Sequence, residues 1–150
     1  MIKIIKKTEM MKSKIQQSII GGIIGTAAMT MVMFIGPMMG MPKMNPAEML
    51  SGMMGLPLMM GWLMHFMIGI VFAFGYILLL KNLFININKK VLKGTIFGFA
   101  VFVFAQIMMA VMGAIMGDMP TPQGNMLLMA IGSIVGHIVY GIVVVLFVKD

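Results

Sequence analysis

The sequence predicts an all-α protein, a four-helix transmembrane bundle with both termini on the cytoplasmic side. Three observations support this fold class. First, 61% of the 150 residues are hydrophobic and only 10% are charged, with a mean hydropathy of +1.06, so polar groups are too few to cover a water-soluble domain. Second, four apolar segments are long enough to span a bilayer, which takes about 20 residues. Third, nearly all lysines fall on one side of these segments.

The four predicted spans form a single membrane domain over residues 1–150. A basic segment of about residues 1–14 precedes the first span, and a long loop of about residues 36–57 follows it. The short second loop on that side, Asp118–Asn125, contains two prolines. The spans cover roughly residues 15–35, 58–80, 91–116 and 126–148.

The lysines indicate how the spans are oriented. Of the eleven, only Lys43 lies in a loop on the opposite side. Because basic residues stay in the cytoplasm, we expect both termini and the loop at 81–93 to be cytoplasmic. The lysines then contact the lipid bilayer rather than nucleic acid. The ten are Lys3, Lys6, Lys7, Lys12, Lys14, Lys81, Lys89, Lys90, Lys93 and Lys149.

The first outer loop contains the start signal of a short helix. Asn45 can cap, Pro46 suits the first helical position and Glu48 suits the first turn. We therefore expect an interfacial helix from about Pro46 to Met53. Trp62 follows at the expected outer boundary between water and lipid, where an amphipathic ring is favoured.

Two similar helical hairpins follow one another in the sequence. The pattern H-x-x-x-G-I-V occurs at 65–71 and again at 137–143, and Gly21-x-x-x-Gly25 is matched by Gly94-x-x-x-Gly98. These matches predict a repeat with its axis along the membrane normal. The alternative is that glycine is simply common in membrane helices.

Methionine is abundant and unevenly placed. Of 24 methionines, 21 lie between Met29 and Met67 or between Met108 and Met129, in the outer loops and outer halves of the spans. One interpretation is a flexible apolar filler or adaptable surface. A second is a path for a soft metal, because thioethers prefer Cu(I) to hard cations. A third is a pocket for an apolar ligand.

Polar side chains inside the spans are the candidate binding residues. A polar group in hydrocarbon is costly, so it normally faces other helices and often marks function. We expect His65 and His137 to face one another at nearly the same depth, with Gln106 within one turn of that level. The candidates are His65, His137, Gln106, Tyr76, Tyr140 and Trp62.

Two opposed imidazoles allow several kinds of chemistry. They could ligate haem iron, share a proton, or bind copper together with methionines such as Met64, Met112 and Met129. The alternative is that each histidine only bonds to a neighbouring helix. Other chemistry is not indicated: there is no cysteine, and the four carboxylates all lie near or beyond the membrane surface, which argues against an enzyme.

The segments Gly36–Leu50 and Gly61–Phe66 carry a resemblance. They read GPMMGMPKMNPAEML and GWLMHF, and they resemble a family of small bacterial four-helix membrane proteins known only as a domain of unknown function. The resemblance implies the helix count and a location in the bacterial inner (cytoplasmic) membrane. It implies no ligand or reaction.

These observations favour a non-enzymatic membrane protein that binds a ligand or partner at its methionine-rich outer side. The partner would be an identical subunit, giving a homo-oligomer, or a larger membrane complex. One alternative is a haem- or copper-binding protein that uses the histidine pair. Another is a small transporter, although four helices form a pore only by oligomerising and no charged residue lines a pathway.

Overall fold

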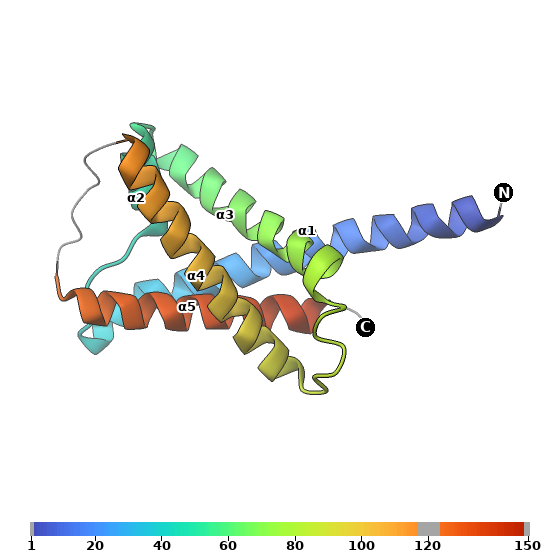
Figure 1. Cartoon of the computed structure of the whole chain (residues 1–150). Helices are drawn as coiled ribbons and strands as arrows, with labels where there is room; N and C mark the ends of the chain where they lie inside the picture. The colour runs from blue at the N-terminus through green and yellow to red at the C-terminus, as the bar shows by residue number, and fades with distance from the viewer. Residues whose placement is uncertain (1, 117–123, 149–150) are drawn as a thin grey trace.

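The chain folds almost entirely into helices. The computed structural model describes residues 2–116 and 124–148, and within these there are four long helices, a shorter one and no strand (Figure 1). The four long helices are long and apolar enough to cross a membrane, which confirms the predicted all-α fold with four candidate spans, while the cytoplasmic orientation of the termini stays a prediction. The helices are α1 (Ile2–Ile35), α2 (Pro46–Met54), α3 (Leu58–Gly75), α4 (Lys90–Met116) and α5 (Met126–Phe147), with a 3-10 turn η1 (Gly36–Met39) and a π-helical turn η2 (Tyr76–Leu80).

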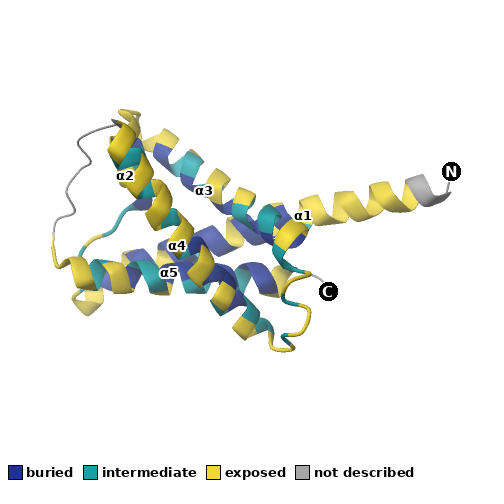
Figure 2. Ribbon diagram, viewed as in Figure 1, coloured by how far each residue is buried: buried dark blue, intermediate teal, exposed yellow. Residues whose placement is uncertain are grey.

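Helix α1 is much longer than the span expected at 15–35. It begins at Ile2 and continues through the basic segment, where Lys, Glu, Met and Gln favour a helix and no Gly or Pro occurs before Gly21. Its first part projects from the other helices as an exposed stem (Figure 2). At 1.5 Å per residue α1 is roughly 50 Å long, which exceeds the hydrocarbon thickness of about 30 Å.

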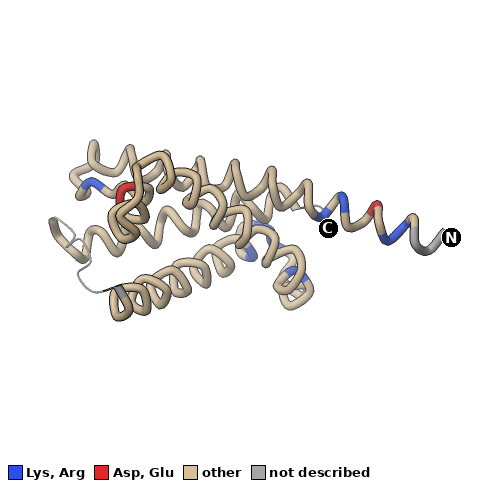
Figure 3. Tube along the Cα trace, turned by 90° about the horizontal axis from the view of Figure 1, so that it is seen from above, with Lys and Arg blue, Asp and Glu red and all other residues tan. Residues whose placement is uncertain are grey.

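The long helices pack in the order α3, α1, α5, α4. Helix α1 contacts both α3 and α5, while α4 contacts chiefly α5 and α2 contacts α3. We call the end that holds η1, α2 and the first turns of α3 and α5 the α2 end. The opposite end, which holds the loop between η2 and α4, is the lysine end; basic residues gather there, with Lys43 on the α2 side (Figure 3).

The aromatic core lies toward the lysine end. The ring centroids of Tyr76 and Phe97 are 4.8 Å apart, and those of Phe97 and Tyr140 are 6.0 Å apart. Farther along, Phe72 of α3 and Phe104 of α4 meet edge to face at 5.4 Å. Beyond this contact the apolar side chains of α4 are largely exposed, and only 17% of its most apolar stretch is buried. Helix α4 therefore diverges from the other helices toward the α2 end.

Helix α2 sits firmly on the first turn of α3. The Asn45 side chain accepts hydrogen bonds from the backbone amides of Ala47 and Glu48, and Gly55 ends the helix at φ +63°. Gly61 has no side chain at the point where the Ala47 carbonyl reaches α3. The sequence predicts a helix over about residues 46–53, and α2 covers this segment. Its interfacial position stays a prediction. Most of the other expected loop, residues 118–123, lies outside the described residues.

Candidate functional site

Glycine sets two close helix crossings that resemble each other. A Cβ atom on Gly22 of α1 would lie 2.6 Å from Cα of Ile70 in α3, and a Cβ atom on Gly94 of α4 would clash with Cα of Ile142 in α5. The corresponding residues of the two pairs are 72 positions apart in the sequence, both for the glycines and for the isoleucines. Gly22, rather than the Gly21 of the sequence pattern, therefore has the place at its crossing that Gly94 has at the other.

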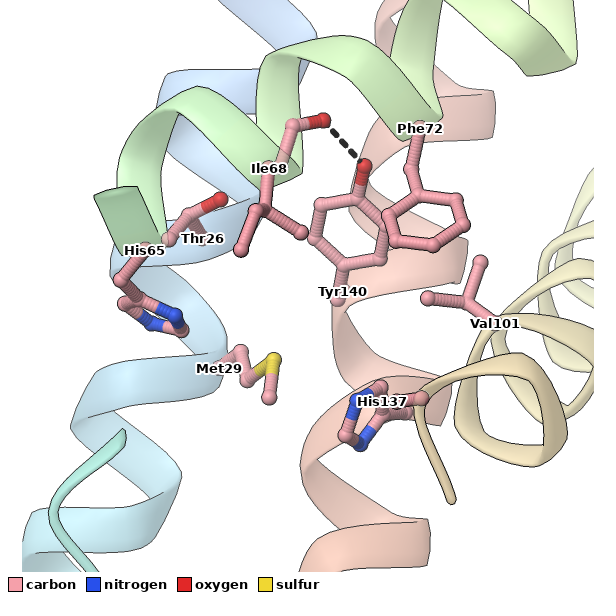
Figure 4. Close-up of a pocket in the computed structure, with 10 residues that line it drawn as sticks. Thr26, Met29, His65, Ile68, Phe72, Val101, His137 and Tyr140 are labelled. Carbon is pink, nitrogen blue, oxygen red and sulfur yellow. Dashed lines mark hydrogen bonds between the residues drawn. The ribbon is translucent and has the colours of Figure 1, made fainter. Parts of the chain in front are cut away.

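These crossings bring the two histidines to one cavity. His65 lies about 1.4 turns before Ile70, the crossing residue in α3, and His137 holds the same place before Ile142 in α5. Both line a cavity of about 70 Å³ between α1, α3, α4 and α5 (Figure 4). The remaining lining residues are Thr26, Met29, Ile68, Gly69, Phe72, Val101, Ala105 and Tyr140.

The hydrogen bond of His65 fixes which ring nitrogen carries a lone pair. The hydroxyl of Thr30 donates its only hydrogen to the backbone carbonyl of Thr26, at 2.8 Å. It must therefore accept a hydrogen bond from Nε2 of His65, which lies 3.1 Å away. In the neutral ring, Nδ1 is then the nitrogen with the free lone pair.

His137 is held in the opposite tautomer. Its Nδ1 lies 2.7 Å from the backbone carbonyl of Ser133, and a carbonyl can only accept. Nδ1 therefore carries the proton in the neutral ring, and Nε2 carries the lone pair. The ring edge also packs on Phe102, with the centroids 5.7 Å apart. Phe102 follows Thr30 by 72 positions, so equivalent positions of α1 and α4 contact the two histidines.

Met29 adds a thioether to this pair. Its side chain is 7% exposed and lies between the two imidazole rings in the view of Figure 4. No hydrogen bond in the described part of the chain involves Nδ1 of His65 or Nε2 of His137. The cavity is therefore lined by two imidazoles, each with one ring nitrogen outside these hydrogen bonds, and by one thioether side chain.

The size and the donors of the cavity restrict what it can hold. A volume of 70 Å³ is the space of about two water molecules, and pockets for cofactors are typically about 300 Å³ or more. The cavity is therefore much smaller than a haem macrocycle. No group of three His, Cys, Asp or Glu side chains occurs among the described residues, so the usual zinc ligand set is not assembled there.

The other predicted binding residues have separate positions. Tyr140 lines the cavity and donates its hydroxyl hydrogen to the Gly69 carbonyl. Trp62 lies beside the cavity, with its ring 6.2 Å from that of His65. Tyr76 does not line the cavity because it packs in the aromatic core. Gln106 is exposed, since Val101 and Ala105 are the residues of α4 that face the cavity.

The methionines proposed as metal ligands are not those at the cavity. Met64, Met112 and Met129 do not line it, whereas Met29 does. Met64 directly precedes His65 and therefore points about 100° away from it around α3. Met112 lies on the diverging part of α4, and Met129 precedes His137 by about two turns. The spacing of Met29 and Met33 could have indicated a second donor helix, but α1 contains no histidine to direct attention to it.

Comparison with known proteins places the chain in a wider group. A model of a family of unknown function, DUF6789, matches residues 12–149. No curated protein and no solved structure matches the chain. The match confirms the family resemblance that the first outer loop and the start of α3 suggested. The bacterial origin stays a prediction.

Proposed function

We propose that this chain, which belongs to the DUF6789 family of unknown function, is a non-enzymatic membrane protein that binds a soft monovalent metal ion, Cu(I), between its helices. One observation supports the proposal above all. Two imidazoles and a thioether line the same small cavity, and each imidazole is held through the nitrogen that a metal would not use.

The donor set matches Cu(I) better than other common metals. Thioether and imidazole are soft to intermediate neutral ligands, which suit Cu(I) and not the hard cations that require carboxylates. Metal-binding histidines usually donate their other N–H group to a carbonyl or similar acceptor, as His137 does to Ser133 and His65 does to Thr30. A single positive charge is also less costly to place among apolar side chains than a double one.

A titration of the purified protein in detergent tests this proposal. The protein competes with a chromophoric chelator for Cu(I), and Ag(I) serves as a redox-inert substitute for the ion. We expect one ion per chain in the wild type and loss of the site in His65→Gln and His137→Gln. We expect Thr30→Val, which removes the hydroxyl that accepts from His65 and its bond to the Thr26 carbonyl, to weaken binding by about 10- to 100-fold.

The control and the contrary outcomes are well defined. Thr95→Val removes a hydroxyl that bonds within α4, to Val91, outside the cavity, and should bind as tightly as the wild type. Absence of binding by the wild type, or wild-type binding by His137→Gln, would overturn the proposal. A reduced-haem absorption band in the purified protein would instead favour the haem alternative, which the volume of the cavity does not support.

We also infer that the two hairpins are a duplicated unit. The crossing pairs Gly22–Ile70 and Gly94–Ile142 support this, as does the contact of each histidine with an equivalent position of its hairpin partner. A repeat of one unit in one orientation would relate the histidines by an axis along the membrane normal. The cavity would then lie on that axis.

The position of the lysines supports a cytoplasmic location of both termini, in the inner membrane of a bacterium. The α2 end would then face outward. Binding of a ligand or protein partner there, assembly into a homo-oligomer or a larger membrane complex, and transport by an oligomer remain predictions. Copper handling is the proposal that the contacts of described residues favour.

A further inference from the structure

We infer that four methionines form a path along which the metal ion reaches the histidine pair from the α2 end. We call Met44, Met41, Met33 and Met29 the methionine ladder. The inference rests on the proposed function, because the ladder has a role only if the cavity binds the ion. It assigns a task to Met44, Met41 and Met33, which lie outside the cavity and which the binding site alone does not explain.

The first step of the ladder lies at Gly132 of α5. A Cβ atom at this glycine would lie 3.5 Å from Sδ of Met41 and 3.6 Å from Sδ of Met44, and it would clash with the terminal methyl group of Met44. Two thioether sulfurs from the segment between η1 and α2 therefore approach the same point on α5. Both side chains are half-buried, so this pair is accessible from the α2 end.

The second step lies one turn farther along α5, at Gly136. A Cβ atom there would lie 3.2 Å from the terminal methyl of Met33 and 3.4 Å from Cγ of Met29. Gly132 and Gly136 are about 6 Å apart along the helix axis. His137 directly follows Gly136, and Met29 itself lines the cavity. The ladder therefore runs from the half-buried pair to the binding site.

The burial of the four side chains changes in the direction of the path. Met33 and Met29 are 6% and 7% exposed, whereas Met41 and Met44 remain partly accessible. Met38, 86% exposed, lies in η1 close to the accessible end of the ladder. Thioethers are neutral ligands, and a series of such sites lets an ion bind strongly enough to enter and weakly enough to move on.

The competing interpretation is that these methionines only fill the space that glycine leaves on α5. Leucine separates the two interpretations, because Met→Leu conserves volume and apolar character but removes the sulfur. If the methionines only fill space, the exchange to leucine leaves both the rate and the equilibrium of metal binding unchanged. If the methionines form a path, the variant keeps the fold and the affinity of the final site but transfers the ion more slowly.

The experiment measures both the rate and the equilibrium of Cu(I) transfer from a chromophoric chelator to the full chain in detergent. We expect Met33→Leu to load roughly tenfold more slowly than the wild type, since one step now has a higher barrier. Its equilibrium affinity should stay close to that of the wild type. Met67→Leu, an exposed methionine on α3 outside the ladder, is the matched control and should change neither quantity.

Each other result has a distinct meaning. A wild type that never binds Cu(I) refutes the proposed function. Normal binding with an unchanged loading rate in Met33→Leu refutes the ladder alone. Loss of equilibrium affinity in Met33→Leu would also overturn the ladder, because Met33 would then belong to the final site. If Met33→Leu does not fold, the double variant Met41→Leu/Met44→Leu at the more accessible step gives the same test.

Discussion

The hydroxyl group of Tyr140 in α5 donates a hydrogen bond to the backbone carbonyl of Gly69 in α3, 2.5 Å away. This bond joins the second hairpin to the first through a tyrosine that is 2% exposed. Its acceptor is the glycine at which α3 meets Thr26 of α1. The contact therefore holds three helices at the level of the cavity.

Replacement of Tyr140 by phenylalanine should lower the stability of the protein modestly. The variant keeps the aromatic packing with Phe97 and loses only the hydroxyl. Hydrogen bonds between membrane helices contribute about 0.6 kcal/mol on average and up to about 1.7 kcal/mol, so we expect a loss in this range. Denaturant unfolding in detergent micelles, followed by circular dichroism, measures the change.

The control for Tyr140→Phe is Thr95→Val, which removes a hydroxyl that bonds only within its own helix. We expect this control to lose less stability. If Tyr140→Phe unfolds at the same denaturant concentration as the wild type, the bond between the hairpins does not contribute to stability.

Alanine at Gly22 or at Gly94 should force the crossing helices apart. The new Cβ atom would meet backbone atoms of Ile70 or Ile142, which cannot rotate away as a side chain can. Overpacking of this kind costs about 1–3 kcal/mol or more. Because a Cβ atom would meet backbone atoms about equally closely at the two crossings, we expect similar losses of stability in the two variants, measured by the same unfolding experiment.

The matched control for these glycines is Gly75→Ala, because a Cβ atom at Gly75 would have no neighbour within 4 Å. Alanine also favours the helix over glycine, by about 1 kcal/mol, so this variant should be as stable as the wild type or more so. A large loss for Gly22→Ala with none for Gly94→Ala would contradict the equivalence of the two hairpins.

Labelling of single engineered cysteines should reveal the orientation in the membrane. The sequence contains no cysteine, so each introduced thiol is unique. In intact bacterial cells we expect a membrane-impermeant maleimide to label Met38→Cys, which is exposed in η1, but not Lys89→Cys at the lysine end. Cell lysis should make Lys89→Cys reactive, which serves as the control. The reverse pattern would refute the cytoplasmic assignment of the lysine end.

The sequence alone predicted the four long helices because length and apolar character determine membrane spans with little help from packing. The start of α2 could be predicted equally well, since the cap by Asn45 and the fixed backbone of Pro46 depend only on residues of the first helical turn. The continuation of α1 through its basic segment was not predicted. Charge marks the limit of a span in the bilayer, but it does not end a helix.

The candidate site was predicted only in part because its members depend on how helices rotate against each other. His65 and His137 share a face with small residues, and the structure brings both to one cavity. Gln106 is exposed because the rotation of α4 follows from the close approach of Gly94 to α5. Met29 could not be singled out among 24 methionines without the contact of α1 with α5.

The tight crossing of α4 on α5 also has a mechanical consequence. Gly94 and Gly98 hold α4 close to α5 near the lysine end, so this crossing acts as a pivot, and the rest of α4 is a lever arm. From Gly98 to Ile115 the arm is about 25 Å long at 1.5 Å per residue. A tilt of only about 5° at the pivot therefore moves the far end of α4 by roughly 2 Å. A small adjustment where Gly98 meets Gly141 would therefore change the separation between the far end of α4 and the other helices.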